Sequence, residues 1–336
     1  MTALAATPGE PAGARPIDTA PINTGPIGPG PARRRRSAGR PVRDFRRTPW
    51  GLAYSAPAVL IFSAFIIIPT AYTFYVSLWH WDSANPAYSK FLGLKNYSNL
   101  FHSNSPGFLA SFGHSFYFAA AMVIGGTTLS LLCALLLQRG GRVLSASRLG
   151  IYMPHATPVI ATSLGWVWIF NPQFGLANWV LNSVGLPTSH WLTSSTSAMP
   201  AIIIFSLWHE IGFTTIVFLG GLAVISDELG EAARVDGCSP WQEFWYITWA
   251  QLRPVITFVV VITAISSLQA FTQFYEMDQG GPAGATTTLS YLIYYEVTAV
   301  TDGQGYGAAI AVVLFLITVF FTLVRRRTSS GSAGLV

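Results

Sequence analysis

Long apolar segments alternate with short polar ones along most of the chain. Six apolar segments, each about 20 residues or longer, lie near residues 50–78, 112–137, 151–170, 199–224, 255–276 and 305–324. A helix of this length crosses the hydrocarbon core of a bilayer. The pattern therefore predicts an all-α membrane protein with six transmembrane helices.

The third segment is the weakest of the six, because it contains Pro154 and Pro158. Proline is tolerated in membrane helices where neighbouring groups satisfy the backbone atoms that it frees. We therefore keep this segment as a predicted span.

Positive charge predicts the orientation. The 17 arginines lie in four groups: the N-terminal tail, the loop with Arg139, Arg142 and Arg148, the loop with Arg234 and Arg253, and Arg325–Arg327. The loops near 171–198 and 277–304 contain no lysine or arginine. Because cytoplasmic loops are enriched in positive charge, six spans with both termini in the cytoplasm fit this distribution. Five or seven spans would place an arginine group outside.

Composition agrees with a membrane location. Hydrophobic residues make up 51% of the 336 residues, charged residues only 10%, and mean hydropathy is +0.45. A soluble domain carries about 25% charged residues. We expect a multi-pass protein of a bacterial-type inner (plasma) membrane. The net charge of +5 does not indicate nucleic-acid binding, because the arginines flank apolar segments.

Three regions are predicted from these patterns. Residues 1–48 are rich in proline, glycine, alanine and arginine, so we expect a disordered cytoplasmic tail. Residues 49–325 form the transmembrane domain, and residues 326–336 form a short cytoplasmic tail.

The polar loop at residues 226–254 predicts a helix, a sharp turn and a second helix. Ser226 or Asp227 can cap the first helix, and acidic residues in its first turns interact favourably with the helix dipole. Gly237 can adopt the left-handed conformation that ends a helix. Ser239, Pro240 and Gln242 predict a capping box with proline at the first helical position. We expect Pro254 to mark the entry to the fifth membrane helix.

This loop also has the properties of a docking surface. Ala232 and Ala233 are small, so another protein can approach the backbone closely, and Glu231 and Asp236 offer acceptors to a basic partner. The alternative is an amphipathic helix lying on lipid headgroups. Such helices favour lysine and arginine on the polar face, whereas this loop has five acids against two arginines.

Polar residues inside apolar segments are candidates for a solute pathway, because a charge in the membrane is costly. Glu210 lies near the middle of the fourth segment, beside Trp208. A carboxylate and an aromatic face suit a polyhydroxylated ligand, although Glu210 could instead make a helix-packing contact. In the predicted fifth helix, Gln269 and Gln273 share one face with Tyr275 nearby; they either line a cavity or bond between helices.

Metal and catalytic motifs are missing from the sequence. A zinc HExxH motif needs a second histidine four residues after His209, and Phe213 occupies that position. His155 is interpreted as a lone structural histidine, and no nucleophile has a base at usable spacing. We therefore expect no metal, no bound cofactor and no enzymatic activity. The sequence also contains no GxxxxGK[ST] phosphate-binding loop.

The segment Glu231-Ala232-Ala233-Arg234-Val235-Asp236-Gly237 resembles the EAA motif of ABC importer permeases. The resemblance covers about residues 50–325 and is greatest to the sugar-permease branch, the maltose and glycerol-3-phosphate type. It includes Trp166-Val-Trp-Ile-Phe-Asn-Pro, Leu219-Gly220-Gly221-Leu222 and Gly305-Tyr306-Gly307-Ala308-Ala309. The chain departs from the family at Trp249-Ala250, where Leu-Pro is usual, and at Cys238, where alanine is common.

The resemblance implies a type I importer permease fold and a set of partners. These are a second permease subunit, two ATPase subunits, an extracellular solute-binding lipoprotein and membrane lipid. ATP would be used by the ATPase subunits, and Glu231, Ala232, Ala233, Asp236 and Gly237 would couple the chain to them. The expected cargo is a carbohydrate or sugar phosphate. One alternative is an ABC permease for an amino acid or other small polar solute. The other is an ion-coupled secondary transporter.

Overall fold

The computed structural model describes residues 49–82, 85–102, 107–138 and 142–330. The predicted tail at residues 1–48 and the last six residues lie outside this range. The chain divides into two units, residues 1–57 and 58–336. Of the first unit, the described residues form the start of helix α1, Pro49–Phe62. The second unit contains all the other described residues.

The regular secondary structure of the described residues is helical apart from one small hairpin, which confirms the predicted all-α class. Strands β1 (Trp79–His80) and β2 (Lys90–Phe91) pair antiparallel, with Trp79 opposite Phe91. The α-helices up to the middle of the chain are α2 (Ile68–Val76), α3 (Lys95–Asn99), α4 (Phe108–Ala121), α5 (Thr127–Leu137), α6 (Arg142–Ala156), α7 (Val159–Ile169) and α8 (Leu176–Ser183). Those after it are α9 (Ala198–Leu222), α10 (Asp227–Val235), α11 (Pro240–Glu243), α12 (Trp249–Leu268), α13 (Thr272–Met277), α14 (Leu289–Thr298) and α15 (Gln304–Ser330).

Short turns of other helix types join several of these elements. Three are π-helical, at Ser63–Ile67, Met122–Gly126 and Phe244–Thr248, and continue the flanking α-helices without a break. Three are 3₁₀ turns, at Pro86–Tyr88, Trp191–Thr193 and Pro282–Gly284.

Five of the described helices are long and apolar enough to cross a membrane, and they agree with five of the six predicted spans. They cover Tyr54–Val76, Phe108–Leu137, Ala198–Leu222, Pro240–Leu268 and Gln304–Leu323. The count of six, and the cytoplasmic placement of both termini, therefore stay predictions.

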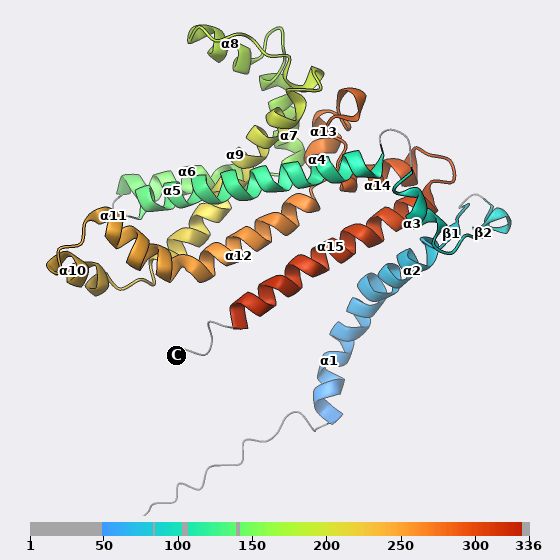
Figure 1. The fold of residues 1–336 in the computed structure, drawn as a ribbon, viewed down its shortest axis with the longest axis horizontal. Helices are drawn as coiled ribbons and strands as arrows, with labels where there is room; N and C mark the ends of the chain where they lie inside the picture. Colours follow the sequence, from blue (N-terminus) through green and yellow to red (C-terminus); the bar gives the residue numbers. More distant parts are fainter. Residues whose placement is uncertain (1–48, 83–84, 103–106, 139–141, 331–336) are drawn as a thin grey trace, which may run out of the picture. The chain divides into compact units, whose positions relative to one another are not determined.

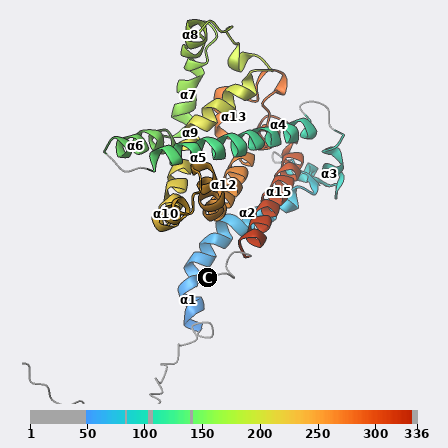
Figure 2. The same ribbon diagram turned by 60° about the vertical axis from the view of Figure 1, so that its left-hand side comes forward.

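The predicted third span is divided in the structure. Helix α6 continues through Pro154 but ends at Ala156, and α7 starts after Pro158. A residue before proline is disfavoured in the helical conformation, so Thr157 is where the helix breaks. Figures 1 and 2 show α7 turning sharply away from α6. Of the two helices, α7 is the apolar one, and it is 11 residues long.

The predicted limits of the fifth helix are wrong at both ends. The helix is continuous from Pro240 to Leu268, so Pro254 lies inside it and does not mark its start. The helix stops at Leu268, and a separate short helix, α13, comes next. The first helical turn tolerates proline best, which favoured a start at Pro254, but a membrane helix also tolerates proline in its interior.

Helix α9 occupies the centre of the packed helices. It contacts α5, α6, α7, α12 and α13, and Figure 1 shows it crossing behind α4 and α5. Ala201, Ile202, Phe205 and Phe218 on α9 are at most 1% exposed. One core cluster joins α9 to α4, α7 and α13, and another joins it to α5 and α12.

Helices α9 and α6 approach each other closely at Gly212. A Cβ atom at this position would lie 2.1 Å from the carbonyl oxygen of Ile151 and 2.8 Å from the Cα of Tyr152. Both are backbone atoms, so a side chain could enter only if α6 moved. Small residues of this kind let membrane helices pack backbone to backbone.

We predict that Gly212→Ala separates α6 from α9 and lowers stability by about 1–3 kcal/mol. Gly220→Ala is the matched control, because a Cβ at Gly220, also on α9, meets nothing within 4 Å. It should be neutral or stabilising, since alanine favours a helix over glycine. Thermal unfolding of the two purified variants in detergent measures the difference. Equal melting temperatures would contradict the close approach.

Candidate functional site

The loop after α9 folds as the predicted helix, turn and helix. The Ser226 side chain accepts a hydrogen bond from the Glu228 amide at 3.3 Å and caps α10. At the other end Gly237 has φ +82°. The Gly237 amide donates to the carbonyl of Arg234 at 3.1 Å, and the Cys238 amide donates to that of Ala233 at 2.9 Å. This pair of bonds is the Schellman motif, so the expected role of Gly237 as the turn is confirmed.

Helix α11 begins with the predicted capping box. The Ser239 side chain accepts from the Gln242 amide, and the Gln242 side chain accepts from the Ser239 amide at 2.8 Å. Pro240 stands at the start of the helix. From there α11, the π turn Phe244–Thr248 and α12 form one continuous helix. The departure from the family pattern at Trp249-Ala250 therefore falls where the π turn becomes α12.

Helix α10 presents one face outward and packs the other against the chain. Glu231, Ala232, Asp236 and Gly237 are exposed, whereas Ala233 is buried. Of the two alanines, only Ala232 is therefore open to a partner. Next to it Val235 is 88% exposed, which gives the outer face an apolar contact point.

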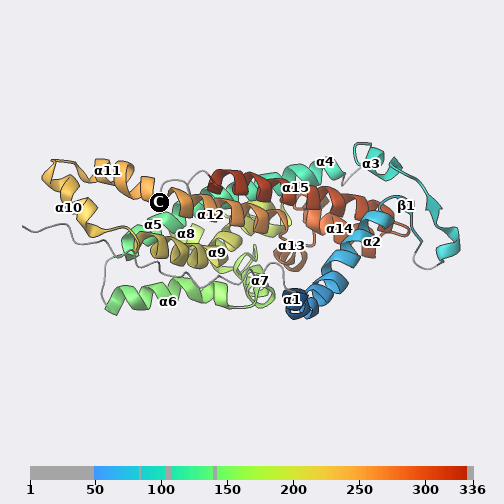
Figure 3. The same cartoon turned by 90° about the horizontal axis from the view of Figure 1, so that it is seen from below.

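Two contacts connect α10 to the residues of α11. Arg234 Nε lies 3.4 Å from Glu243 Oε2, and a Cβ at Gly230 would come 2.8 Å from the same carboxylate. A cavity of about 730 Å³ lies behind this contact, lined in part by Arg148, Asp227 and Glu243. Figure 3 shows α10 and α11 together at the end where α12 begins.

The path candidates on α9 lie in two different environments. Trp208 is 38% exposed and packs against Trp166 and Phe205, with ring centroids 5.2 and 6.4 Å away.

Glu210 lies at the middle of α9, as predicted. Its Oε2 atom is 3.2 Å from Nδ1 of His155 on α6. His155 is therefore not a lone histidine, contrary to the sequence-based expectation.

The other three path candidates do not share one helix. Gln269 caps the C-terminus of α12, and Gln273 and Tyr275 belong to α13. The expectation that Gln269 and Gln273 lie on one face of the fifth helix is wrong, because the helix ends at Leu268. Tyr275 stacks on Phe271 and meets the edge of Tyr294. The core cluster that contains Phe205 also borders Tyr275, so Trp208 and Tyr275 flank the same packed region.

Sequence reasoning missed a second acidic residue, Asp278, in the glycine-rich turn after α13. The Thr286 hydroxyl lies within 2.9 Å of both carboxylate oxygens of Asp278 and donates to them. Burial raises the pKa of Asp278 to about 6, and the Thr286 hydrogen bond opposes that rise. Gly280 and Gly281, with φ +89° and +73°, allow the turn. The run Gly280-Gly281-Pro282 was the available signal.

Known proteins resemble the chain over most of its length. Residues 126–330 match the family described as "Binding-protein-dependent transport system inner membrane component". The trehalose/maltose transport system permease protein MalF of Thermococcus litoralis is 32% identical over 83% of this chain and 93% of its own length. The sn-glycerol-3-phosphate transport system permease protein UgpA of Salmonella typhi is 31% identical over 87% and 97%.

Two further comparisons extend this picture. The sulfoquinovosyl glycerol transport system permease protein SmoG of Agrobacterium fabrum is 32% identical over 81% of this chain and 87% of its own length. A chain in the crystal structure of a bacterial alginate ABC transporter, solved with a periplasmic protein bound to alginate pentasaccharide, shares the fold. It has a TM-score of 0.72 and 23% identity, over 85% of this chain and 96% of that one.

We predict that Asp278→Asn removes a pH-dependent loss of stability. Because the folded-state pKa of about 6 is above the ordinary value of 3.8, folding favours the protonated carboxyl. The contribution of Asp278 is therefore fully present below pH 3.8 and is lost as the pH rises through about 6. The difference between the two pKa values corresponds to on the order of 3 kcal/mol at neutral pH.

The asparagine still accepts the Thr286 hydrogen bond but carries no charge. At pH 7.5 the variant should therefore melt at a higher temperature than the wild type, and at acidic pH the two should converge. Thermal unfolding across this pH range tests the expectation. A constant difference at every pH would contradict it.

Proposed function

Because the chain belongs to the family of binding-protein-dependent transport system inner membrane components, we propose that it is the permease subunit of an ATP-driven carbohydrate importer. It is a multi-pass inner-membrane protein of a transport system. The proposal concerns the class of cargo, the partners and the residues that connect them.

The proposed class of cargo is supported mainly by the solutes named for the relatives. Three of them are permeases for trehalose and maltose, for glycerol 3-phosphate and for sulfoquinovosyl glycerol. Each solute is polyhydroxylated. The same chemistry suits Trp208 and Tyr275, whose rings can stack on a sugar face, and Gln269 and Gln273, whose amides can bond hydroxyl groups. This favours a carbohydrate or sugar phosphate as the cargo over an amino acid, and the membership of a binding-protein-dependent family favours an ATP-driven importer over an ion-coupled secondary transporter.

We propose that transport is driven by a pair of separate ATPase subunits, which use the ATP. The outer face of α10, with Glu231, Ala232, Val235 and Asp236, would enter a groove on one of them, and Glu231 would pair with a basic residue there. A second permease subunit would complete the pathway, and an extracellular solute-binding lipoprotein would deliver the cargo. This chain would bind no nucleotide.

Uptake by reconstituted vesicles tests the proposed cargo. The full chain is co-purified with its proposed partner subunits, reconstituted and supplied with the binding protein and internal ATP. We expect uptake of one of a panel of labelled disaccharides and glycerophosphodiesters, and no uptake of labelled amino acids. ATP-dependent amino-acid uptake without sugar uptake would overturn the proposal.

We predict that Glu231→Lys uncouples transport from ATP use. The reversed charge would repel a basic partner group, so uptake should fall by about tenfold or more, equivalent to about 1.4 kcal/mol of lost contact. Glu228→Lys is the matched control, because Glu228 is also exposed on α10, outside the predicted contact. Membrane insertion of both variants should be unchanged.

Gly237→Val tests the turn by a different physical route. A side chain has open space there, but a left-handed backbone at φ +82° strains any β-branched residue. Gly185→Val imposes the same strain at φ +74°, also with open space, in the loop after α8. We expect only Gly237→Val to abolish sugar-stimulated ATPase activity. Equal effects at both glycines, or normal uptake by Glu231→Lys, would exclude the proposed coupling surface.

A further inference from the structure

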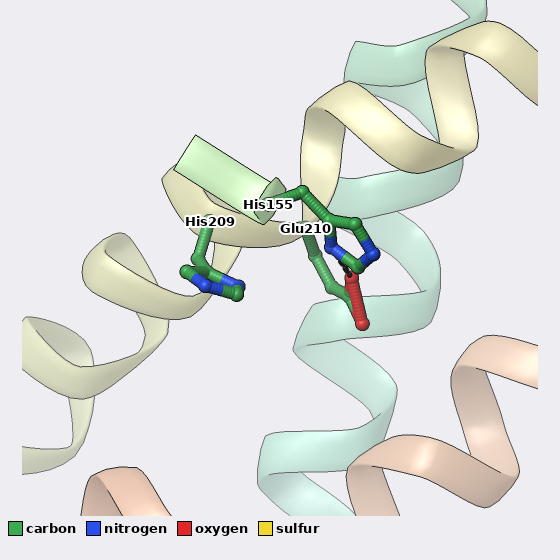
Figure 4. Close-up of side chains that lie close together, drawn as sticks. All are labelled: His155, His209 and Glu210. Carbon is green, nitrogen blue, oxygen red and sulfur yellow. Dashed lines mark ion pairs between the residues drawn. The ribbon is translucent and has the colours of Figure 1, made fainter. Parts of the chain in front are cut away.

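Three potential metal ligands meet at the contact between α6 and α9. They are His155 from the last turn of α6 and the consecutive residues His209 and Glu210 from the middle of α9. One ligand atom from each lies within 4.8 Å of the other two. Figure 4 shows the His155 ring beside the Glu210 carboxylate, with the His209 ring set apart to the left of this pair.

The contact between His155 and Glu210 is not an ordinary hydrogen bond. His155 Nδ1 and Glu210 Oε2 are 3.2 Å apart, yet neither atom has a hydrogen-bond partner, and both are shielded from solvent. The two buried atoms face each other as an ion pair without hydrogen-bonding geometry, and buried polar atoms that lack hydrogen bonds are costly in a membrane. An ion between them would satisfy both.

The spacing fits a transition metal. Zinc binds imidazole nitrogen and carboxylate oxygen at about 2.0–2.2 Å in a tetrahedral arrangement, which places two ligand atoms about 3.3 Å apart. The pair of His155 and Glu210 already has this separation. All three ligand atoms lie within 4.8 Å of one another, so bringing them to the tetrahedral spacing takes a shift of about 1.5 Å at most.

The surroundings support the histidine ligands. His209 Nε2 lies 3.3 Å from the carbonyl oxygen of Thr157. A carbonyl can only accept, so Nε2 donates and the lone pair of the ring is at Nδ1. A metal-binding histidine usually donates its other nitrogen in this way. His155 is held by Phe213, whose ring stacks on it at 5.0 Å.

The site is only partly enclosed by the described part of the chain. The His155 and Glu210 side chains are 29% and 32% exposed, although their facing atoms are covered. His209 is buried. Two neutral imidazoles and one carboxylate are a ligand set that suits zinc and related divalent transition metals, with a fourth position open for water.

We propose that His155, His209 and Glu210 bind one divalent transition metal of the zinc class, which ties the end of α6 to the middle of α9. This site gives Glu210 a role other than direct contact with the cargo. It does not depend on which solute is transported.

Direct metal binding tests the proposal. The full chain, purified in lipid nanodiscs through an affinity tag without histidine, is loaded with Zn²⁺ and desalted, and its zinc is measured by mass spectrometry. We expect about one zinc per chain. Loading with Co²⁺ instead should give the visible absorption of a tetrahedral cobalt site. Wild-type protein without stoichiometric zinc or this absorption would overturn the proposal and leave a plain His155–Glu210 ion pair.

Three variants locate the ion. His155→Gln and Glu210→Gln should lose zinc, and the rise in melting temperature that zinc causes in the wild type should disappear. His190→Gln is the control, since His190 is exposed and outside the cluster, and it should bind zinc as the wild type does. Equal zinc in all variants would place the ion elsewhere and reject the site. The cobalt absorption of the wild type decides the question even if a variant fails to fold.

Discussion

The backbone-to-backbone contact between α9 and α6 at Gly212 is the constraint on which the rest of the site depends. Helices in lipid gain little from burying apolar surface against each other, so close packing of small residues holds them together. Gly212 brings α9 onto Ile151, and this places Glu210 beside His155. Because α9 also contacts α5, α7, α12 and α13, a shift of α9 would be transmitted to most of the described helices.

The α10–α11 element is attached to this core in a way that can transmit force. On one side it comes after α9 and a short turn at Ser226, and on the other α11 runs into α12 as one continuous helix. The Arg234–Glu243 ion pair joins the two short helices. A partner that pushes on Glu231 and Val235 therefore acts on the ends of two spanning helices, with no slack loop between them. Ala233 is buried in this arrangement, so it packs within the α10–α11 element and does not belong to the outer face proposed for docking.

The helix–turn–helix structure of the loop at residues 226–254 could be predicted from sequence because its determinants are local. The Ser226 cap, the Gly237 turn and the capping box of Ser239 and Gln242 each depend on residues within a few positions of one another. The same is true of the five long spans, which are determined by length and composition. The proposed role of α10 in docking rests on the family resemblance, and the structure adds which of its side chains face outward.

The limits of the third and fifth segments could not be predicted, and for two of these limits the reason is that proline has two outcomes that local rules do not separate. At Pro254 the helix continues, whereas at Pro158 it ends, and the tertiary environment decides between them. The break at Pro158 turned the predicted third span into two helices. The early end at Leu268 moved Gln273 and Tyr275 onto α13, away from the helix on which they were expected. Neither event leaves a distinctive pattern in the neighbouring residues.

The same break creates the histidine and glutamate cluster. Because α6 stops at Ala156, the carbonyl of Thr157 is free to accept from His209 Nε2. His155 lies in the final turn, where its ring reaches Glu210. Had α6 continued straight into α7, the Thr157 carbonyl would have bonded within the helix and left His209 without this partner. His155 and Glu210 are far apart in sequence and belong to no spacing motif. The two side chains meet because α6 ends just before Pro158 and because Gly212 lets the backbones of α6 and α9 approach closely.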